Sequence, residues 1–419
     1  MAEVQPFPAL HYDLARVGSL QYVAAPPYDV IDAAQRAELL RGSPFNVVEI
    51  DLPQAGPGED PYRHAASTLE EWELEGILRQ DREPSLWALT QDYTAPDGSA
   101  ATRHAILARV RVEEYGPGRV RPHERTQPGP KQDRLDLTRA TRFNLSPIFS
   151  LSSADAWPHV NASAGDEPWG EVTDDDGTVH RVWRIDDPAV HEAVAATLAG
   201  AELLIADGHH RYETARTYMQ EVGGEGPQCY TLMALTALDD PGLTVFPTHR
   251  LLGGLADDPE QREHLREGLR ELFESEDVAD SELDPAREEG IGVFGFIDSH
   301  HGQPLRLRLK DTAELDRLLG DRPEAYRRLD VAILESLVLT GILGLDEDDI
   351  AAKRGIGYAK SIPEVMGALD GGGYDAAFVL RPTPIEQVRD VAATGETMPP
   401  KSTYFFPKIL SGIVFNPLS

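Results

Sequence analysis

The sequence is short of cysteine, of long apolar runs and of basic charge. Its single cysteine, Cys229, excludes an intramolecular disulfide and a cysteine metal cluster, and we expect it to be buried. No apolar run approaches the roughly 18 residues that cross a bilayer, and the N-terminus lacks the basic and apolar regions of a signal peptide. We therefore expect no membrane association, and the cytoplasm is the expected location.

The shortage of basic charge limits the choice of partners. The chain has 39 Lys and Arg against 71 Asp and Glu, a net charge of −32. Such a surface repels nucleic-acid phosphates and anionic lipid, so DNA is not an expected partner. With 419 residues, 41% of them hydrophobic, the chain is long enough for two or three globular domains.

Apolar alternation around turn residues predicts antiparallel hairpins, and these interleave with helical patterns. The expected class is therefore mixed α+β rather than a doubly wound parallel sheet. The predicted hairpins pair 86–93 with 104–112, 171–173 with 178–185, and 292–297 with 305–309. Helices are predicted at 60–78, 188–198, 212–220, 259–273, 328–342 and 362–369, a strand at 44–53, and an acidic connector at 274–289.

Three lobes follow from this organisation. Residues 1–150 form an N-terminal α+β lobe with a basic island, and residues 151–290 form a central lobe with a strand-turn-helix motif. Residues 291–419 form a C-terminal α+β lobe, and we expect one of its loops to close the site.

The strand-turn-helix motif is the most informative stretch. The apolar run 203–206 predicts a buried strand, and a helical pattern follows the next turn. A helix start offers backbone N–H groups and a positive dipole end, so two imidazoles and a guanidinium there predict a phosphate site. We expect Gly208 and Arg211 to bind phosphate, and Asp207, His209 and His210 to be catalytic, with Asp207 as a general base or a Mg²⁺ ligand.

A basic island reverses the charge of the chain locally. Residues 119–142 contain seven basic residues against three acidic ones. Glu124 lies among these cations, so we expect it to stay ionised and to accept a proton from a hydroxyl group. His123, Lys131 and Arg134 are further candidates for binding phosphate. The alternative is a helix face that forms surface ion pairs.

The third candidate segment is 398–408, near the C-terminus. Lys401, Ser402 and Thr403 stand in a proline-framed loop, and an ammonium group beside two hydroxyls suits phosphate oxygens. The same segment also predicts a strand, with the aromatic residues 404–406 in the core. The two interpretations are compatible.

Two other patterns point to different chemistry. Asp174 to Gly177 resembles the nucleophile box of haloacid-dehalogenase-type phosphatases, but no buried strand precedes it, so a hairpin turn is favoured. A zinc site would combine His209 or His210 with Asp207 and a distant histidine such as His123 or His249. Magnesium accompanying a phosphate is favoured over zinc, because it needs fewer protein ligands.

Several long motifs resemble a widespread prokaryotic domain-of-unknown-function family, some members of which are labelled ParB-like. The matching segments are 25–31, 43–46, 123–126, 130–135, 144–149, 206–215 and 398–408. Gly208 to Arg211 resembles the phosphate box of the ParB/sulfiredoxin-like superfamily, which includes free-serine kinases. The resemblance implies a ParB/sulfiredoxin-like core with a phosphate or a nucleotide, such as ATP or ADP, at this box.

The predicted function is that of a phosphate-handling enzyme acting on a small phosphorylated metabolite or a nucleotide. The resemblance implies phosphoryl transfer or hydrolysis involving serine or phosphoserine. Two alternatives remain open: a ParB-like nucleotide-binding switch or interaction module without turnover, and a metal-dependent hydrolase. The acidic composition and the lack of a basic recognition helix depart from the DNA-partition branch of the superfamily.

Overall fold

The structure, a computed structural model, describes residues 2–96, 98–126 and 128–419, and it divides into two compact units. Unit 1 takes in Met1–Pro122, Thr126–Thr244 and Pro407–Ser419, and unit 2 takes in His123–Arg125 and Val245–Phe406. This division differs from the three predicted lobes, because position 150 lies inside a strand of unit 1 and position 290 lies inside unit 2. The C-terminal segment returns to unit 1, which sequence order does not reveal.

Unit 1 is built on a nine-stranded mixed sheet with the order β6-β11-β8-β12-β5-β4-β10-β9, and β1 also pairs with β5. The pairs β11–β6 and β12–β8 are parallel, and the remaining pairs are antiparallel. The strands are β1 (Val4–Gln5), β4 (Leu86–Thr94), β5 (Ala100–Arg111), β6 (Val120–Arg121), β8 (Ile148–Ser152), β9 (Gly170–Thr173), β10 (Val179–Ile185), β11 (Leu203–Asp207) and β12 (Tyr230–Ala237).

Helices cover this sheet where alternate strand residues form an apolar face. Ile106 and Ala108 of β5 belong to one buried cluster with Val194 of the helix α7 and Tyr212 of the helix α8. The helices of unit 1 are α1 (Leu14–Val17), α2 (Ala33–Gly42), α3 (Val48–Asp51), α4 (Pro61–Leu74), α5 (Pro128–Thr141), α6 (Trp157–Asn161), α7 (Pro188–Leu198) and α8 (His209–Val222). Short strand pairs join β2 (Leu10–Tyr12) to β3 (Leu78–Gln80) and β7 (Phe143–Asn144) to β21 (Asn416–Pro417).

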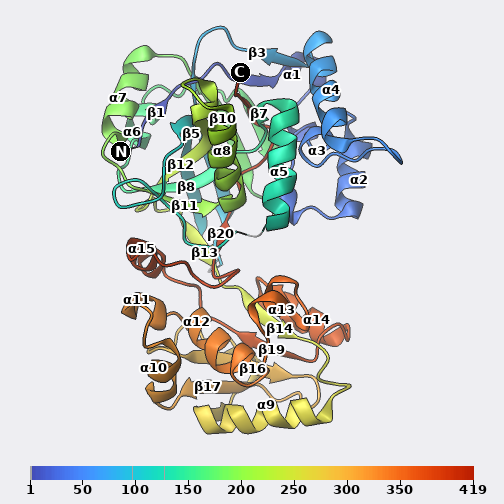
Figure 1. Cartoon of the computed structure of the whole chain (residues 1–419), viewed down its shortest axis with the longest axis vertical. Coiled ribbons are helices and arrows are strands. Elements are labelled where there is room, and N and C mark those ends of the chain that lie inside the picture. The colour runs from blue at the N-terminus through green and yellow to red at the C-terminus, as the bar shows by residue number, and fades with distance from the viewer. Residues whose placement is uncertain (1, 97, 127) are drawn as a thin grey trace. The chain divides into compact units, whose positions relative to one another are not determined.

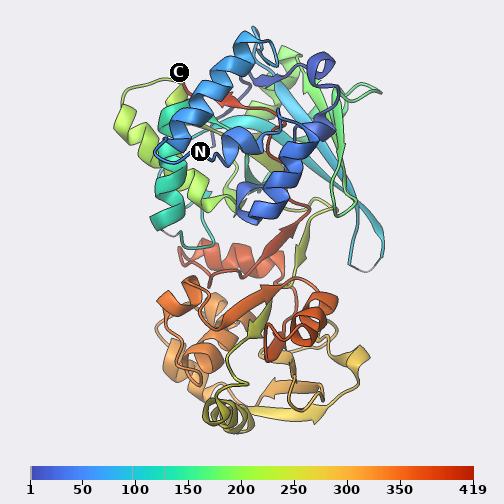
Figure 2. The same cartoon turned by 90° about the vertical axis from the view of Figure 1, so that its right-hand side faces the viewer.

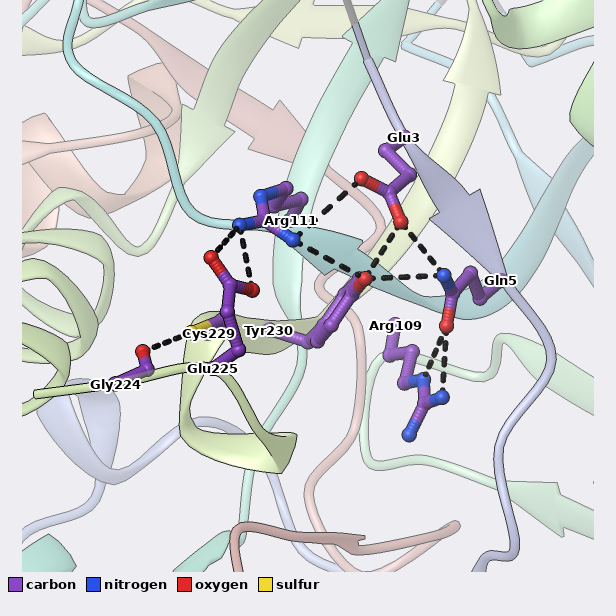
Figure 3. A network of polar contacts seen from close by, with 8 residues as sticks. All are labelled: Glu3, Gln5, Arg109, Arg111, Gly224, Glu225, Cys229 and Tyr230. Carbon is purple, nitrogen blue, oxygen red and sulfur yellow. Dashed lines mark hydrogen bonds and ion pairs between the residues drawn. The ribbon is translucent and has the colours of Figure 1, made fainter.

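A polar network fastens the N-terminal strand to the sheet (Figure 3). The Tyr230 hydroxyl donates to Glu3 at 2.5 Å and accepts from Gln5 at 3.0 Å, while the Arg109 guanidinium lies 4.8 Å from the Tyr230 ring centre. The adjacent Cys229 thiol is buried and donates to the Gly224 carbonyl at 3.4 Å. The predicted burial of Cys229 is therefore confirmed.

Unit 2 contains a six-stranded antiparallel sheet with the order β15-β17-β16-β19-β14-β18. Its helix α9 lies along the outside of the unit (Figures 1 and 2). The strands are β14 (His249–Leu252), β15 (Phe273–Asp277), β16 (Val293–Asp298), β17 (Leu305–Leu309), β18 (Ile356–Ala359) and β19 (Ala376–Val379). The helices are α9 (Pro259–Leu272), α10 (Ala313–Leu319), α11 (Glu324–Arg327), α12 (Asp330–Leu334), α13 (Glu347–Ala351), α14 (Ile362–Asp370) and α15 (Ile385–Ala393). Mixed and antiparallel sheets with many helices confirm the α+β class.

Local structure follows the sequence closely where a cap or a turn is explicit. The three predicted hairpins form, and α4 begins where the Asp60 carboxylate accepts the Tyr62 N–H at 3.0 Å. Among the described residues, no helix has the length and apolar character needed to cross a bilayer.

Three predicted elements differ from the structure. The strand predicted at 44–53 is instead the short helix α3, because the Asn46 side chain accepts the Val48 N–H and donates to the carbonyls of Tyr22 and Ala24. Part of the acidic connector 274–289 is the edge strand β15, whose backbone pairs with β17. The helix predicted at 328–342 is α12 followed by a π-helical stretch, Glu335–Thr340.

Gly295 in β16 provides a test of the packing in unit 2. A β-carbon at this position would clash with the Leu283 carbonyl oxygen. We expect Gly295→Ala to lower the free energy of unfolding by about 1–3 kcal/mol, as overpacked sites do. Gly367→Ala in α14 is the matched control, because its β-carbon meets no atom within 4 Å, and it should be neutral or stabilising by up to about 1 kcal/mol. Urea unfolding measures both, and equal stabilities would contradict the described packing.

Candidate functional site

The predicted strand-turn-helix motif is present in unit 1. Strand β11 ends at Asp207, Gly208 adopts a left-handed φ of 96°, and α8 begins at His209. The positive φ favours glycine here, and a β-carbon on Gly208 would also approach the Arg211 Nε to 2.9 Å, so the guanidinium would have to shift. As the N-cap residue, Gly208 has no side chain to accept the first N–H groups of α8, a feature of helix starts that receive anions.

Two cations hold the Asp207 carboxylate. Lys408 Nζ lies 2.8 Å from Oδ1, and Arg211 Nη2 lies 2.7 Å from Oδ2. Burial raises the pKa of Asp207, but the charges of Lys408 and Arg211 outweigh burial and lower this pKa well below its usual range. Such a carboxylate accepts a proton poorly, so the geometry opposes the predicted role of Asp207 as a general base. Asp207 instead holds the side chains of Arg211 and Lys408 in position.

A buried network positions Lys408. Gln91 Nε2 donates to the Lys408 carbonyl at 2.8 Å, and Arg103 donates to the Pro407 carbonyl. Arg103 is fully buried, which lowers its pKa to about 9, and it also donates to Gln91 Oε1 at 3.0 Å. Through these bonds the core of the sheet fixes the backbone from which Lys408 reaches Asp207.

Helices α5 and α8 run side by side in the same direction (Figure 1). Thr214 donates to the Lys131 carbonyl at 3.4 Å near their starts, and Arg139 pairs with Glu221 at 2.6 Å near their ends. Counting back from these contacts at 1.5 Å per residue, the two starts are level to within about 3 Å. Two positive dipole ends therefore lie next to each other.

Arg134 of the basic island is a buried member of this site. It pairs with Asp51 at 3.0 Å and with Asp133 at 2.7 Å, and its guanidinium lies 4.1 Å from the centre of the Tyr28 ring. Burial lowers the pKa of Arg134, but the two carboxylates outweigh it and raise this pKa overall. Ser146 donates to the other Asp51 oxygen at 2.6 Å. The Arg134 charge is thus already satisfied within the protein.

Arg211 and Arg134 line one cavity of about 40 Å³, together with polar side chains such as Asn144 and Thr231. Arg211 also donates to the Pro147 carbonyl. The cavity suits ordered water rather than a nucleotide.

Other predicted residues lie in unit 2 and form a second group there. His123 Nε2 is 2.9 Å from the Thr403 hydroxyl, and both side chains are buried. The His123 carbonyl accepts the Met398 N–H at 2.7 Å, and Glu124 forms a parallel bridge with Met398. The segments around 123 and 398 are therefore neighbours, although about 270 residues separate them in the sequence.

The buried Arg250 shapes the loop around Lys401. Its guanidinium donates to the carbonyls of Lys401 at 3.1 Å and Pro400 at 3.3 Å, and Lys401 takes a φ of 56° with its side chain exposed. Ser402 is buried and donates its hydroxyl hydrogen to the Pro399 carbonyl at 2.5 Å. This hydrogen is not available to a phosphate, so the predicted donor role of Ser402 needs correction, while Lys401 remains exposed.

The alternative patterns fold as structural elements. Asp174 accepts the N–H groups of Asp176 and Thr178 in the β9–β10 turn, as expected of a hairpin. His249 Nδ1 accepts the Leu380 N–H at 3.1 Å, and burial with the neighbouring Arg250 lowers its pKa to about 4. Within the described part of the chain, no three His, Cys, Asp or Glu side chains gather in a way that would hold a metal ion.

The predicted residues thus fall into two groups. Unit 1 brings together Lys131, Arg134 and the 207–211 segment, and unit 2 brings together His123, Glu124 and the 401–403 segment. Sequence reasoning missed three members of the first group, Tyr28, Asp51 and Lys408. Tyr28 and Lys408 lie in the motif segments 25–31 and 398–408, which was a usable signal, whereas nothing in the sequence marked Asp51.

The chain matches the model of the family described as "Protein of unknown function (DUF1015)" over residues 4–332. The chain belongs to this family. No curated protein matches this DUF1015 chain.

Several solved structures are similar to this DUF1015 chain, with low scores. A conserved hypothetical protein from Pyrococcus furiosus is 15% identical, with a TM-score of 0.36, and the match covers 69% of this chain and 88% of that one. A free serine kinase variant in complex with ADP is 15% identical, with a TM-score of 0.36, covering 68% and 83%. SbnI with a C-terminal truncation, from Staphylococcus aureus, is 14% identical, with a TM-score of 0.37, covering 74% and 87%.

The lowered pKa of Asp207 predicts a pH dependence of stability. The ionised pair stabilises the fold above the unfolded carboxyl pKa of about 3.9, and this contribution is lost as the pH falls through the lower folded-state value. We expect Asp207→Asn to cost about 3 kcal/mol at pH 7, because it leaves two partly buried cations without their partner. The difference from the wild type should shrink below pH 4.

Urea unfolding between pH 3 and 8 measures this difference. Asp136→Asn is the control, because it breaks a more exposed ion pair with Arg139 and should cost less than about 1 kcal/mol. A difference between wild type and Asp207→Asn that stays constant over the whole pH range would contradict the assignment.

Proposed function

We propose that unit 1 binds the phosphate group of a small phosphorylated metabolite or nucleotide, and that the protein catalyses phosphoryl transfer or hydrolysis. One observation supports this most directly: motif segments that are distant in sequence meet at the start of α8. Tyr28 stacks on Arg134, Arg211 contacts the Pro147 carbonyl, and Lys408 pairs with Asp207. A chain of net charge −32 has here assembled four cations, including Lys131, at two helix starts.

Charge and exposure assign different roles to these cations. Arg134, Arg211 and Lys408 each form an ion pair with a carboxylate, so their main role is structural. Their positive charges also make the local electrostatic potential more favourable for an anion. Lys131 is half-buried in the first turn of α5, and within the described residues its ammonium forms no ion pair. We assign Lys131, beside the positive dipole ends of α5 and α8, to the phosphate oxygens.

Serine or phosphoserine is the substrate that the resemblance of the Gly208 to Arg211 segment to the phosphate box supports. Phosphoryl transfer requires mainly positioning and charge stabilisation, which this arrangement provides. Glu124, which the sequence suggests as a general base, lies in unit 2, so it is given no role at the unit 1 site. His209 and His210, in the first turn of α8, stay proposed catalytic residues, and a ParB/sulfiredoxin-like core stays a proposal.

Magnesium does not fit Asp207 in this arrangement. Both carboxylate oxygens already contact cations, Lys408 and Arg211, and these charges repel a divalent ion. No step is therefore assigned to a protein-bound metal at this residue, and Mg²⁺ enters the experiment only as a companion of the nucleotide.

The test is turnover by the full-length protein, followed by ³¹P NMR. The reactions are phosphoserine alone, and serine with ATP or with ADP, each with and without Mg²⁺. We expect phosphate release or transfer in at least one of them, and His210→Gln should slow it about 100-fold or more, as loss of a general acid–base group does. Tight ADP binding without any turnover would instead favour the nucleotide-binding switch.

Lys131→Ala tests the phosphate site itself by calorimetric titration with ADP and with phosphoserine. Losing one charge-assisted hydrogen bond of about 1.5–3 kcal/mol should weaken binding of the productive ligand about 10- to 100-fold. Arg139→Ala is the matched control on the same helix, because it loses only partly exposed ion pairs with Asp136 and Glu221. Equal affinities of the two variants would overturn the assignment of Lys131.

A further inference from the structure

Unit 2 contains a cavity of about 220 Å³ that is separate from the residues discussed above. Helix α9 forms one wall with Arg262, Leu265 and Arg266, which are spaced to share one helix face. Leu265 is buried, whereas Arg266 is one-third exposed and pairs with Glu263 at 3.2 Å. This wall therefore combines an apolar contact with two guanidinium groups.

The ends of two neighbouring strands form another wall. Asp298 ends β16, Asp375 precedes β19, and the Ser299 N–H donates to the Asp375 carbonyl at 2.8 Å. Asp375 Oδ2 accepts the Leu255 N–H at 2.8 Å. Asp298 Oδ1 accepts the His301 N–H at 2.7 Å and lies 2.9 Å from Nδ1 of the His301 ring. A carboxylate has about four acceptor positions, so both groups can accept further hydrogen bonds.

The charges on the two walls restrict the ligand. A simple anion would be repelled by the carboxylates of Asp298 and Asp375. A metal cation would be repelled by the guanidinium groups of Arg262 and Arg266. A neutral apolar molecule would remove Arg262 and Asp375 from water without supplying a partner charge. A zwitterion satisfies both walls, because its carboxylate suits guanidinium groups and its ammonium suits carboxylates.

The volume of the cavity and its apolar lining restrict the identity of the ligand further. A cavity of about 150 Å³ is known to hold benzene, so 220 Å³ admits a molecule only moderately larger. Leu255, Leu265 and Phe296 contribute apolar surface to the lining. We propose that this cavity is a binding site for a small apolar α-amino acid of about the size of valine or leucine. The site is independent of the phosphate site proposed in unit 1.

Calorimetric titration of the full-length protein with L-leucine, L-valine and L-alanine tests the proposal. We expect at least one to bind, and its affinity should fall at least 10-fold in Arg262→Ala and in Asp375→Asn. For leucine, the analogues 4-methylpentanoate and isoamylamine, which each lack one charge, should bind at least 10-fold more weakly. Arg270→Ala is the matched control, because Arg270 lies on the exposed part of α9 and does not line the cavity.

Three results would overturn the proposal: no binding of any of the three amino acids, unchanged affinity in both cavity variants, or equal affinity for an analogue with a single charge. Thermal unfolding without ligand shows whether a variant is folded, and Arg262→Ala should melt with the wild type because alanine favours helix. Lys131→Ala should bind the amino acid normally. Normal binding by this variant would show that the cavity is distinct from the phosphate site. If Lys131→Ala instead lost amino-acid binding, the amino acid would be assigned to unit 1 and the proposal would be overturned.

Discussion

The ionised carboxylate of Asp207 is the interaction on which the site in unit 1 depends. It lies at the junction of β11 and α8, and it joins Arg211 of the same turn to Lys408 from the end of the chain. Because both partners are cations, Asp207 stays charged despite burial. The pair fixes the C-terminal segment to the end of β11, and Arg103 and Gln91 bond to the carbonyls of Pro407 and Lys408 in that segment.

A second buried pair, Arg134 with Asp51, sets the position of α5. Tyr28 covers the guanidinium, and burial raises the pKa of this phenol to about 12 despite the charges of Arg211 and Arg134, so it stays protonated. Most of the cationic charge at the helix starts is thus matched by carboxylates. The positive charge that remains for a ligand is small, and it lies at Lys131 and at the two positive dipole ends of α5 and α8.

The site residues fall into two groups, one in each unit. Unit 1 carries the helix starts and their cations, and unit 2 carries the His123–Thr403 contact and the loop around Lys401, which the buried Arg250 holds in place. The cavity beside α9 is lined by residues of neither group, and two arginines and two aspartates are among its lining residues. A phosphate site and a zwitterion site would therefore differ in electrostatics as well as in position within the fold.

The sequence by itself determined the α+β class, the three hairpins, the cap of α4 and the strand-turn-helix at Asp207, because each depends on neighbouring residues: period-2 alternation, turn pairs and a capping carboxylate. It failed at 44–53, where Asn46 bonds to residues over twenty positions away, and at β15, where pairing with β17 stabilises an acidic strand. Only the tertiary structure decided that Asp51 pairs with Arg134 and that Lys408 reaches Asp207. Those contacts join segments whose separation leaves no periodic trace in the sequence, and they exist only once the backbone has closed around them.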